Sequence, residues 1–286
     1  MQLSEGVWAL ALETPTLPPA TATNTVVFAG DRLLVVEPAT PHAGERARLD
    51  ALLDERITEG RALAGLCLTH HHIDHVGYAQ ALRERTGAPI FAHAETAARL
   101  PFAVDVCIDE GWRMDLGRGV VVEALHTPGH APGHLVFWEQ GSAVAHVGDL
   151  VAGEGTILID PSDGGDMARY LESLRRMAAR VGEGREADAP APRFVPAHGE
   201  TIEDPLAVLE RYIGHRLARE DIVRRAILEG GARDFEAILA TAYADTPRAL
   251  WPIAALSLEA HLGKLVGDEE LAREGEGRAA RYAPRS

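Results

Sequence analysis

Short apolar runs separated by turn-forming residues fill the first two thirds of the chain. Residues 25–29 and 32–37 are two such runs on either side of Gly30-Asp31, an arrangement that predicts a β-hairpin. Further apolar runs predict strands at 63–69, 89–92, 120–125, 135–138, 142–147 and 194–195. Apolar residues at helical spacing predict helices at 45–59, 78–86 and 167–181, followed by a Gly-, Glu- and Pro-rich loop at 182–192. Strand–helix alternation mixed with consecutive strands predicts a mixed sheet with helices on its faces.

The pattern changes after Asp204-Pro205, where longer helical patterns replace the short apolar runs. They predict one long helix or two abutting helices at 206–228, and further helices at 235–244 and 253–265. No strong strand pattern occurs in this part, and the polar tail from Asp268 is expected to fray. We therefore expect two domains, a larger one at 1–204 and a small, mainly helical one at 205–286.

Acidic side chains outnumber basic ones by 43 to 28, so the formal net charge is −15. Residues 205–286 hold 12 basic and 13 acidic side chains, a net of −1, which leaves −14 on residues 1–204. This balance argues against a protein that grips nucleic acid through its overall charge, because phosphate binding needs a basic face. Basic and acidic residues alternate on one predicted helix and are expected to form an ordinary solvated face: Arg216, Arg219, Glu220, Asp221, Arg224 and Arg225.

The composition is that of a globular protein, with 46% hydrophobic residues. No apolar run reaches the roughly 18 residues that a membrane-spanning helix needs, and the first residues lack the basic and apolar segments of a secretory signal. We therefore expect a cytoplasmic protein that does not associate with a membrane. The cysteines, Cys67 and Cys107, form no C-x-x-C pair, which excludes a cysteine-based zinc or redox site.

Nine of the 13 histidines fall between positions 70 and 146, a density that favours metal binding. The centre of this cluster is the run Thr-His-His-His-Ile-Asp-His at 69–75, directly after a predicted buried strand. Alternate side chains of an extended segment share a face. Three ligand-type side chains can therefore point the same way: His70, His72 and Asp74. His71 would point away from them, and His75 can join them if a helix begins near position 74.

Further ligand-type residues also follow predicted strands. The loop at 126–134 reads His-Thr-Pro-Gly-His-Ala-Pro-Gly-His, and its two prolines and two glycines make a tight turn that can hold a histidine rigidly. Asp149 follows the strand at 142–147, and His198 follows the strand at 194–195. Because side chains at the ends of strands in a mixed α/β fold gather at one edge, these residues can converge on the first cluster.

This order of residues resembles the metallo-β-lactamase superfamily. The resemblance rests on H-x-H-x-D-H at 70–75, followed by a Pro-Gly-His turn, Gly-Asp and His-Gly, which place His130, Asp149 and His198. It spans about residues 20–204. The C-terminal part, through the segments at 212–220 and 260–265, resembles the helical, winged-helix-like extension of the lactamase-β-like-2 hydrolase branch.

The resemblance implies a four-layer αβ/βα sandwich, an α/β fold in which two mixed sheets pack face to face with metals at one edge. It also implies two divalent metal ions, most readily zinc, with manganese or iron as alternatives. The first ion would be held by His70, His72 and His130, the second by Asp74, His75 and His198, and Asp149 would bridge both.

Other residues receive supporting roles in this interpretation. Asp74 is also the expected catalytic residue, because a carboxylate beside a bridging hydroxide can orient it and accept its proton. His134 is expected behind the ligands or against the substrate. Glu37 stands where the superfamily often has Asp-Thr-Gly or Asp-Pro-Gly, so the acidic position is retained and the glycine is lost. The remaining histidines of the cluster are expected to be structural: His71, His93, His126 and His146.

The implied activity is that of a binuclear hydrolase in which a metal-bridging hydroxide attacks an ester, thioester or related small acyl substrate. Single-stranded RNA cleavage is an alternative that the acidic charge disfavours, and a mononuclear iron dioxygenase acting on persulfides is another. A non-catalytic binding protein is disfavoured because no ligand position is lost. The C-terminal helices are expected to cap the active-site groove or to form a homodimer interface, and the glycine-containing segment 153–161 is expected to border the site.

Overall fold

Two mixed β-sheets form the centre of the molecule, for which the computed structural model describes residues 1–153, 155–182 and 190–285. In the first sheet, β1 to β4 run antiparallel and β4 to β7 run parallel. Its strands follow one another in the order of the sequence: β1 (Gln2–Ser4), β2 (Val7–Glu13), β3 (Ala22–Ala29), β4 (Arg32–Val36), β5 (Ala62–Cys67), β6 (Ile90–Ala92) and β7 (Val106–Cys107).

The second sheet pairs β12 with β11 in parallel and then continues antiparallel. Its order is β12 (Arg193–Pro196), β11 (Val144–Gly148), β10 (Leu135–Glu139), β9 (Val121–His126) and β8 (Arg113–Asp115). The facing sides of the two sheets share one hydrophobic core, in which Phe28 of the first sheet and Phe137 of the second are fully buried.

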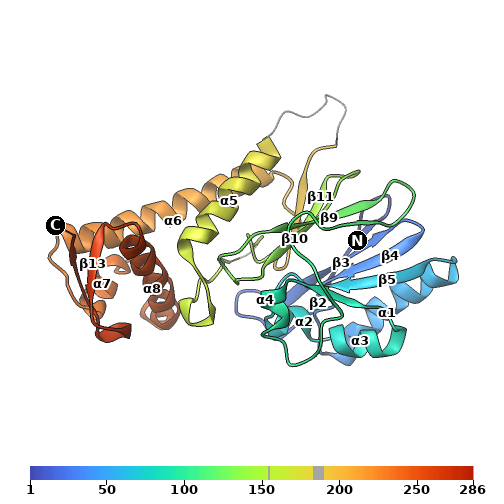
Figure 1. Ribbon diagram of the computed structural model, residues 1–286, viewed down its shortest axis with the longest axis horizontal. Coiled ribbons are helices and arrows are strands. Elements are labelled where there is room, and N and C mark those ends of the chain that lie inside the picture. Colours follow the sequence, from blue (N-terminus) through green and yellow to red (C-terminus); the bar gives the residue numbers. More distant parts are fainter. Residues whose placement is uncertain (154, 183–189, 286) are drawn as a thin grey trace.

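Helices cover the outer face of each sheet (Figure 1). On the first sheet, α1 (Ala43–Thr58) and α3 (Ala79–Thr86) bury Leu49 and Leu82 in a second core. On the second sheet, α5 (Met167–Gly182) and the first half of α6 (Pro205–Leu228) bury Leu174 in a third. The resulting order of helices, sheet, sheet and helices confirms the predicted four-layer sandwich. Short helices α2 (Ile73–Val76), α4 (Ala94–Ala97) and η1 (Pro161–Asp163) lie in the connections.

The sequence pattern located most elements within a few residues. The hairpin predicted around Gly30-Asp31 is confirmed, because β3 and β4 pair antiparallel with Phe28 opposite Leu34. The helix predicted at 78–86 ends at Gly87, whose backbone is left-handed with φ of 72°, a conformation that glycine adopts without strain. Strands β1, β2, β7 and β8 were not predicted; β7 and β8 have only two and three residues, too few to show an alternating pattern.

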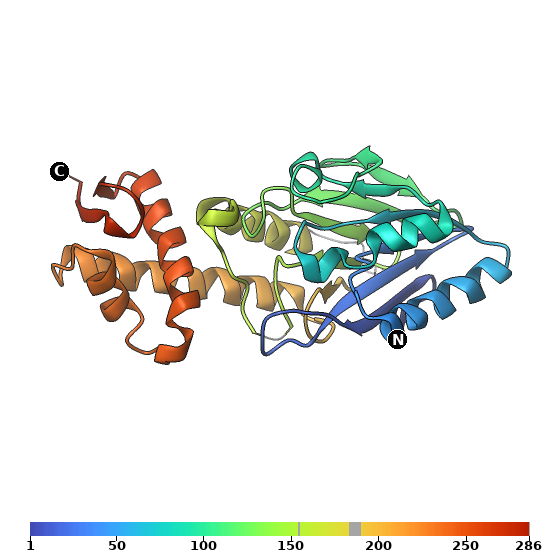
Figure 2. The same ribbon diagram turned by 90° about the horizontal axis from the view of Figure 1, so that it is seen from below.

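The C-terminal part contains α7 (Phe235–Ala242), η2 (Arg248–Leu250), α8 (Trp251–Gly267) and η3 (Gly277–Ala279), and it lies to one side of the sandwich (Figure 2). The absence of strands and the fraying tail expected from the sequence were both wrong, because β13 (Leu271–Glu274) and β14 (Arg281–Pro284) form an antiparallel hairpin. Leu271 and Tyr282 pack from it onto α7 and α8. These strands escaped prediction because each buries few side chains, and most of their residues are exposed.

Helix α6 joins the two parts of the molecule by contributing to both of their cores. Leu209 and Tyr212 in its first half pack with α5, while Val223 and Ile227 in its second half pack with α7 and α8. Packing therefore continues across the predicted boundary between 204 and 205, which stays a prediction.

The charged residues of α6 differ in their surroundings. Arg216 and Glu220 are 4% and 8% exposed, so the solvated face expected for this helix was wrong for these two. Arg216 contacts α5 and Glu220 contacts α8, so neighbouring helices cover this side of α6. The charge pattern of the helix does not show which side is covered. Arg225 lies at the surface and pairs with Asp221, as a solvated face requires.

Two predicted segments lie partly outside the described residues, namely positions 183–189 of the loop at 182–192 and position 154 of the segment at 153–161. Among the described residues, none of the helices combines the length and the apolar character needed to cross a membrane.

Candidate metal centre

The loop that follows β5 carries the first group of predicted ligands. Leu66, Cys67 and Leu68 are fully buried and fix the loop to the sheet, and His70 after them is fully buried as well. Helix α2 begins at Ile73, with the backbone of His72 extended just before it. This turn from strand to helix directs the side chains of His70, His72 and His75 toward one another.

Three imidazoles form the first cluster. His70 Nε2 lies 2.9 Å from His72 Nδ1 and 3.2 Å from His130 Nε2, while His72 Nδ1 and His130 Nε2 are 3.1 Å apart. His130 comes from the loop between β9 and β10, so the cluster joins the edges of both sheets. The converging nitrogens can hold one metal ion between them, the donor set that suits zinc.

The second cluster lies beside the first and contains His75, His198 and Asp74. His75 Nε2 is 3.6 Å from Asp74 Oδ1, and His198 Nε2 is 3.5 Å from Asp74 Oδ2. His198 follows β12, so it reaches this point from the other sheet. Two imidazoles and a carboxylate can hold zinc, manganese or iron.

The carboxylate of Asp149, at the end of β11, lies between the two clusters. Its Oδ2 is 3.4 Å from His130 Nε2 and 3.7 Å from His75 Nε2, and its Oδ1 is 3.5 Å from His198 Nε2. The structure thus brings all seven predicted ligand positions to one edge of the sandwich.

The outer nitrogens of these rings donate hydrogen bonds, which leaves lone pairs on the inner nitrogens of His70, His130 and His198. His130 Nδ1 lies 2.7 Å from the Leu158 carbonyl oxygen, His198 Nδ1 lies 3.0 Å from that of Ala22, and each donates its proton there. His70 Nδ1 donates to Thr69 Oγ1, and His75 Nδ1 to Glu37. The inner atoms His75 Nε2 and Asp149 Oδ1 are buried and have no hydrogen-bond partner among the described residues. This set of inward-facing nitrogen and oxygen atoms fits divalent metal ions.

Burial and neighbouring charges shift the pKa values of the cluster in opposite directions. Burial lowers the pKa of His130 to about 4 and holds that of His70 well below its usual value. Burial also acts to lower the pKa of His75, but the carboxylates of Glu37, Asp149 and Asp74 outweigh it and raise the value to about 10. Burial acts to raise the pKa of Asp149, but His75 and His198 lower it to about 2.

Glu37, at the end of β4, is fully buried behind the second cluster. It accepts hydrogen bonds of 2.8 Å from His75 Nδ1 and from His146 Nε2, and another from Thr69 Oγ1. Burial alone would raise its pKa, but the imidazoles of His75 and His146 hold it well below the usual value. The acidic position retained in the sequence therefore orients His75, a role that the sequence left open. His146, expected to be structural, is its second partner.

His134 and Gly148 fix the backbone of Asp149. His134 is fully buried, and its Nε2 accepts a 3.0 Å hydrogen bond from the Asp149 amide while its Nδ1 contacts Thr127 Oγ1. Gly148 has φ of 49°, and a Cβ there would lie 2.6 Å from His134 Nε2. The Gly-Asp dipeptide is thus required by close packing against the histidine.

The remaining histidines lie outside the two clusters. His71 turns away from His70 and donates from Nε2 to Asp163. His93 stacks on His126 with 4.4 Å between ring centroids. His126 Nε2 donates to the Pro132 carbonyl oxygen, and His93 Nδ1 accepts from the Glu95 amide, so both rings have structural partners.

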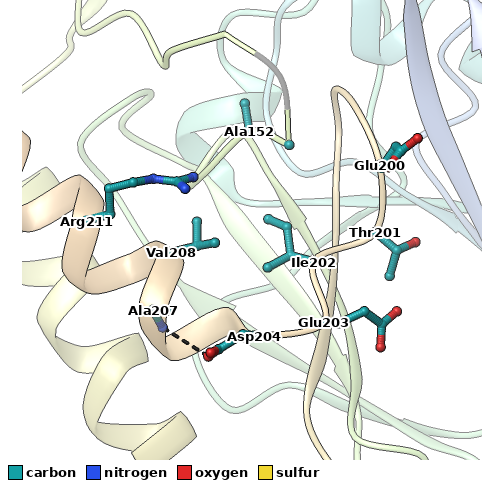
Figure 3. A pocket seen from close by; sticks show the side chains of 10 residues that line it. Ala152, Glu200, Thr201, Ile202, Glu203, Asp204, Ala207, Val208 and Arg211 are labelled. Atoms are coloured by element: carbon teal, nitrogen blue, oxygen red, sulfur yellow. Dashed lines mark hydrogen bonds between the residues drawn. The ribbon is translucent and has the colours of Figure 1, made fainter.

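A surface cavity of about 310 Å³ lies between the loop that follows β12 and the first turns of α6, and its lining residues are outside both clusters (Figure 3). One wall is formed by Ala152 and Gly153, and the Gly153 amide donates to the carbonyl oxygen of His198. Arg211 extends from α6 toward Ala152, and Glu200 lies across the cavity from it (Figure 3). The segment expected to border the site does so, since Leu158 contacts His130 directly.

Comparisons with known proteins find two matching family models. Residues 18–183 match the family model described as "Metallo-beta-lactamase superfamily", and residues 235–279 match "Beta-lactamase associated winged helix domain". The chain is 28% identical over 229 residues to the "Beta-lactamase-like protein 2 homolog" of Drosophila melanogaster, covering 74% of this chain and 72% of that protein. It is 30% identical over 213 residues to a "Hydroxyacylglutathione hydrolase" of Methylococcus capsulatus, covering 72% and 78% respectively.

The fold is shared with solved structures at low sequence identity. A "Beta-lactamase domain protein" from Burkholderia ambifaria has a TM-score of 0.81 and 20% identity, over 99% of this chain and 93% of that one. A "metallo-beta-lactamase family protein" from Thermus thermophilus has a TM-score of 0.75 and 21% identity, over 99% and 100%. Both alignments include the C-terminal region, so the whole architecture recurs.

Proposed function

The chain belongs to the metallo-β-lactamase superfamily and is a metal-dependent hydrolase, and we propose that it is a binuclear enzyme acting on small esters and thioesters. The matches also confirm the two-part resemblance seen in the sequence, a catalytic fold followed by a winged-helix-like region. Cytoplasmic location and a homodimer remain predictions.

The observation that carries the proposal is the position of Asp149 between two separate clusters. A single ion would need only one of them, whereas a carboxylate that lies close to histidines of both clusters suits two ions that share a ligand. His70, His72 and His130 would hold one ion, most readily zinc. Asp74, His75 and His198 would hold the other, and Asp149 would contact both.

Two divalent cations bound there would lower the pKa of a coordinated water from 15.7 toward about 7 and polarise the carbonyl group under attack. Asp74 lies within 3.6 Å of both His75 and His198, which supports the proposal that its carboxylate orients a water molecule and accepts its proton. Glu37 and His134 would keep His75 and Asp149 in position while this proton moves.

Two observations favour a small acyl substrate. A relative that matches most of this chain is named hydroxyacylglutathione hydrolase, and an acylglutathione is a thioester. The net charge of −14 on residues 1–204 opposes long-range attraction of a polyanion such as RNA.

The test compares hydrolysis of a panel of thioesters and esters with cleavage of single-stranded RNA by the zinc-loaded protein. We expect turnover of acyl substrates that is lost in His72→Ala and kept in His42→Ala, because His42 is exposed and lies outside both clusters. RNA cleavage without acyl hydrolysis would assign the site to phosphodiesters. Purification with one iron per chain and no hydrolysis would favour the dioxygenase alternative.

A further inference from the structure

Residues 156–163, here called the strap, contact His130 through Leu158 and His72 through Asp163. We propose that the strap positions His72 and His130 for metal binding, and that Asp163 is the positioning residue of His72. This inference rests on the proposed function, since it concerns two of the residues proposed to hold metal. It also gives a role to His71, the middle histidine of the run at 70–72, and to Arg216 of α6.

The contact between Asp163 and His72 decides which nitrogen of His72 faces the metal. His72 Nε2 lies 2.7 Å from Asp163 Oδ2, so this nitrogen carries the proton and donates it to the carboxylate. The opposite nitrogen, Nδ1, keeps its lone pair and points at His70 and His130. A carboxylate behind a ligand imidazole fixes its tautomer and ring orientation and makes it a stronger donor to the metal.

His71 holds the same carboxylate from a second direction. Its Nε2 lies 3.1 Å and 3.0 Å from the two oxygens of Asp163, and its side chain is largely buried. The run of three histidines therefore has two different tasks, because His70 and His72 face the metal centre while His71 locks the group that orients His72.

The other end of the strap acts on His130. The Leu158 carbonyl oxygen accepts the proton of His130 Nδ1 at 2.7 Å, which leaves Nε2 free to face the cluster. Next to it, the Ile157 carbonyl oxygen accepts a hydrogen bond from Arg216 of α6. Arg216 is buried and lies over the ring of Tyr170 on α5, so it fixes this end of the strap to α6.

Local structure holds Asp163 at its position in η1. The side chain of Asp160 accepts hydrogen bonds from the Ser162 amide and hydroxyl, and Gly164 ends the turn with φ of 85°. Ile157 and Ile159 are buried in the core that α5 and α6 share, and η1 packs against α8. The strap is therefore anchored by side chains at both ends and along its length.

The experiment measures the affinity of the full-length, metal-free protein for Zn²⁺ by competition with a chromophoric chelator. Asp163→Ala is expected to bind zinc about 10–100-fold more weakly at its affected site, the loss typical of removing such a carboxylate. Asp163→Asn is expected to lose less, because its amide oxygen can still accept the proton of His72. Asp166→Asn is the matched control, since it removes the same charge three residues away and Asn still caps α5.

A second readout separates positioning from general stability. In zinc-loaded protein labelled with ¹⁵N-histidine, we expect a slowly exchanging Nε2 proton on His72, whose exchange is faster in Asp163→Ala and unchanged in Asp166→Asn. Equal zinc affinity of Asp163→Ala and the wild type would overturn the inference and leave the proposed function standing. A wild type that binds no zinc, manganese or iron would overturn both.

Discussion

Glu37 accepts hydrogen bonds from two buried imidazoles, so its loss should lower the stability of the metal-free protein. Glu37→Ala leaves a charged His75 without its buried partner, and breaking such a pair typically costs about 3–5 kcal/mol. We expect the free energy of unfolding of the metal-free protein, measured in urea, to fall by this amount. The exposed Glu5→Ala should change it by less than about 0.5 kcal/mol, and equal effects of the two variants would contradict the role given to Glu37.

The pKa of His75 predicts a proton release when metal binds. With a value of about 10, His75 carries two ring protons at pH 7, and the proton on Nε2 must leave before that nitrogen can bind metal. His130, with a pKa of about 4, is neutral at pH 7 and keeps its one proton on Nδ1, so Nε2 has no proton to lose. Zinc loading at pH 7 should therefore release about one proton per chain from this source. Calorimetry in buffers of different ionisation enthalpy measures it, and a loading heat independent of the buffer would contradict the assignment.

The ligand residues could be predicted from the sequence, but the groups that orient them could not. His70, His72 and Asp74 stand close together in a recognisable order, whereas Asp163 lies 91 residues from His72 in a segment without a motif. Glu37 was marked only by its acidic side chain after a strand. Contacts of this kind depend on how distant loops meet, which local pattern does not contain.

At the scale of elements, the turn from β11 into Asp149 is the most constrained connection in the site. Gly148→Ala would place a Cβ against His134 in a left-handed backbone, so we expect a loss of roughly 1–3 kcal/mol in stability and weaker metal retention. Gly214→Ala is the matched control. At this exposed helical position, an added Cβ would have no described atom within 4 Å apart from the backbone of its own helix.

Alanine at position 214 should stabilise α6 by roughly 0.5–1 kcal/mol, since glycine is unfavourable inside a helix. Chemical denaturation and elemental analysis measure both variants. The two substitutions should thus change stability in opposite directions, and a destabilisation of equal size in both would show that the packing around Gly148 does not matter.

Elements with strong periodicity were predicted and those with mixed exposure were not. The hairpin at β3 and β4 buries nearly every residue, so its apolar run is unambiguous. The hairpin at β13 and β14 gains its stability from a few anchors such as Leu271 and Tyr282 on the C-terminal core. Their neighbours are charged and exposed, so tertiary packing decides an element that local pattern leaves undefined.

At the scale of the whole molecule, the C-terminal region contributes to the metal centre. Arg216→Met keeps much of the buried side-chain volume but removes the hydrogen bond to the strap, so we expect zinc affinity to fall by about 10-fold. Arg225→Met, at an exposed position of the same helix, should leave the affinity unchanged. Chelator competition measures the zinc affinity of both variants. Identical affinities would mean that α6 supports the fold but does not affect metal binding.

The net charge can be assigned mostly to one part of the chain, but it says little more about function. Asp149 and Asp74 have a place in the metal centre, whereas most of the net charge of −15 lies elsewhere and bears only on the choice of substrate. The order of helices and strands predicted a mixed sheet with helices on its faces, whereas the four layers followed from the resemblance to the metallo-β-lactamase superfamily. The sequence could not predict that α6 contributes to two cores. A long helical pattern looks the same whichever partners the helix packs against.

The central claim is that two metal ions make this chain a hydrolase of small acyl substrates. The most direct measurement titrates the metal-free protein with Zn²⁺ while thioester hydrolysis and bound metal per chain are followed together. Activity should be absent at the start and should rise until two ions are bound per chain, and Asp149→Ala should neither retain the metal nor gain activity. Full hydrolysis by the metal-free protein, or saturation at one ion, would contradict the claim.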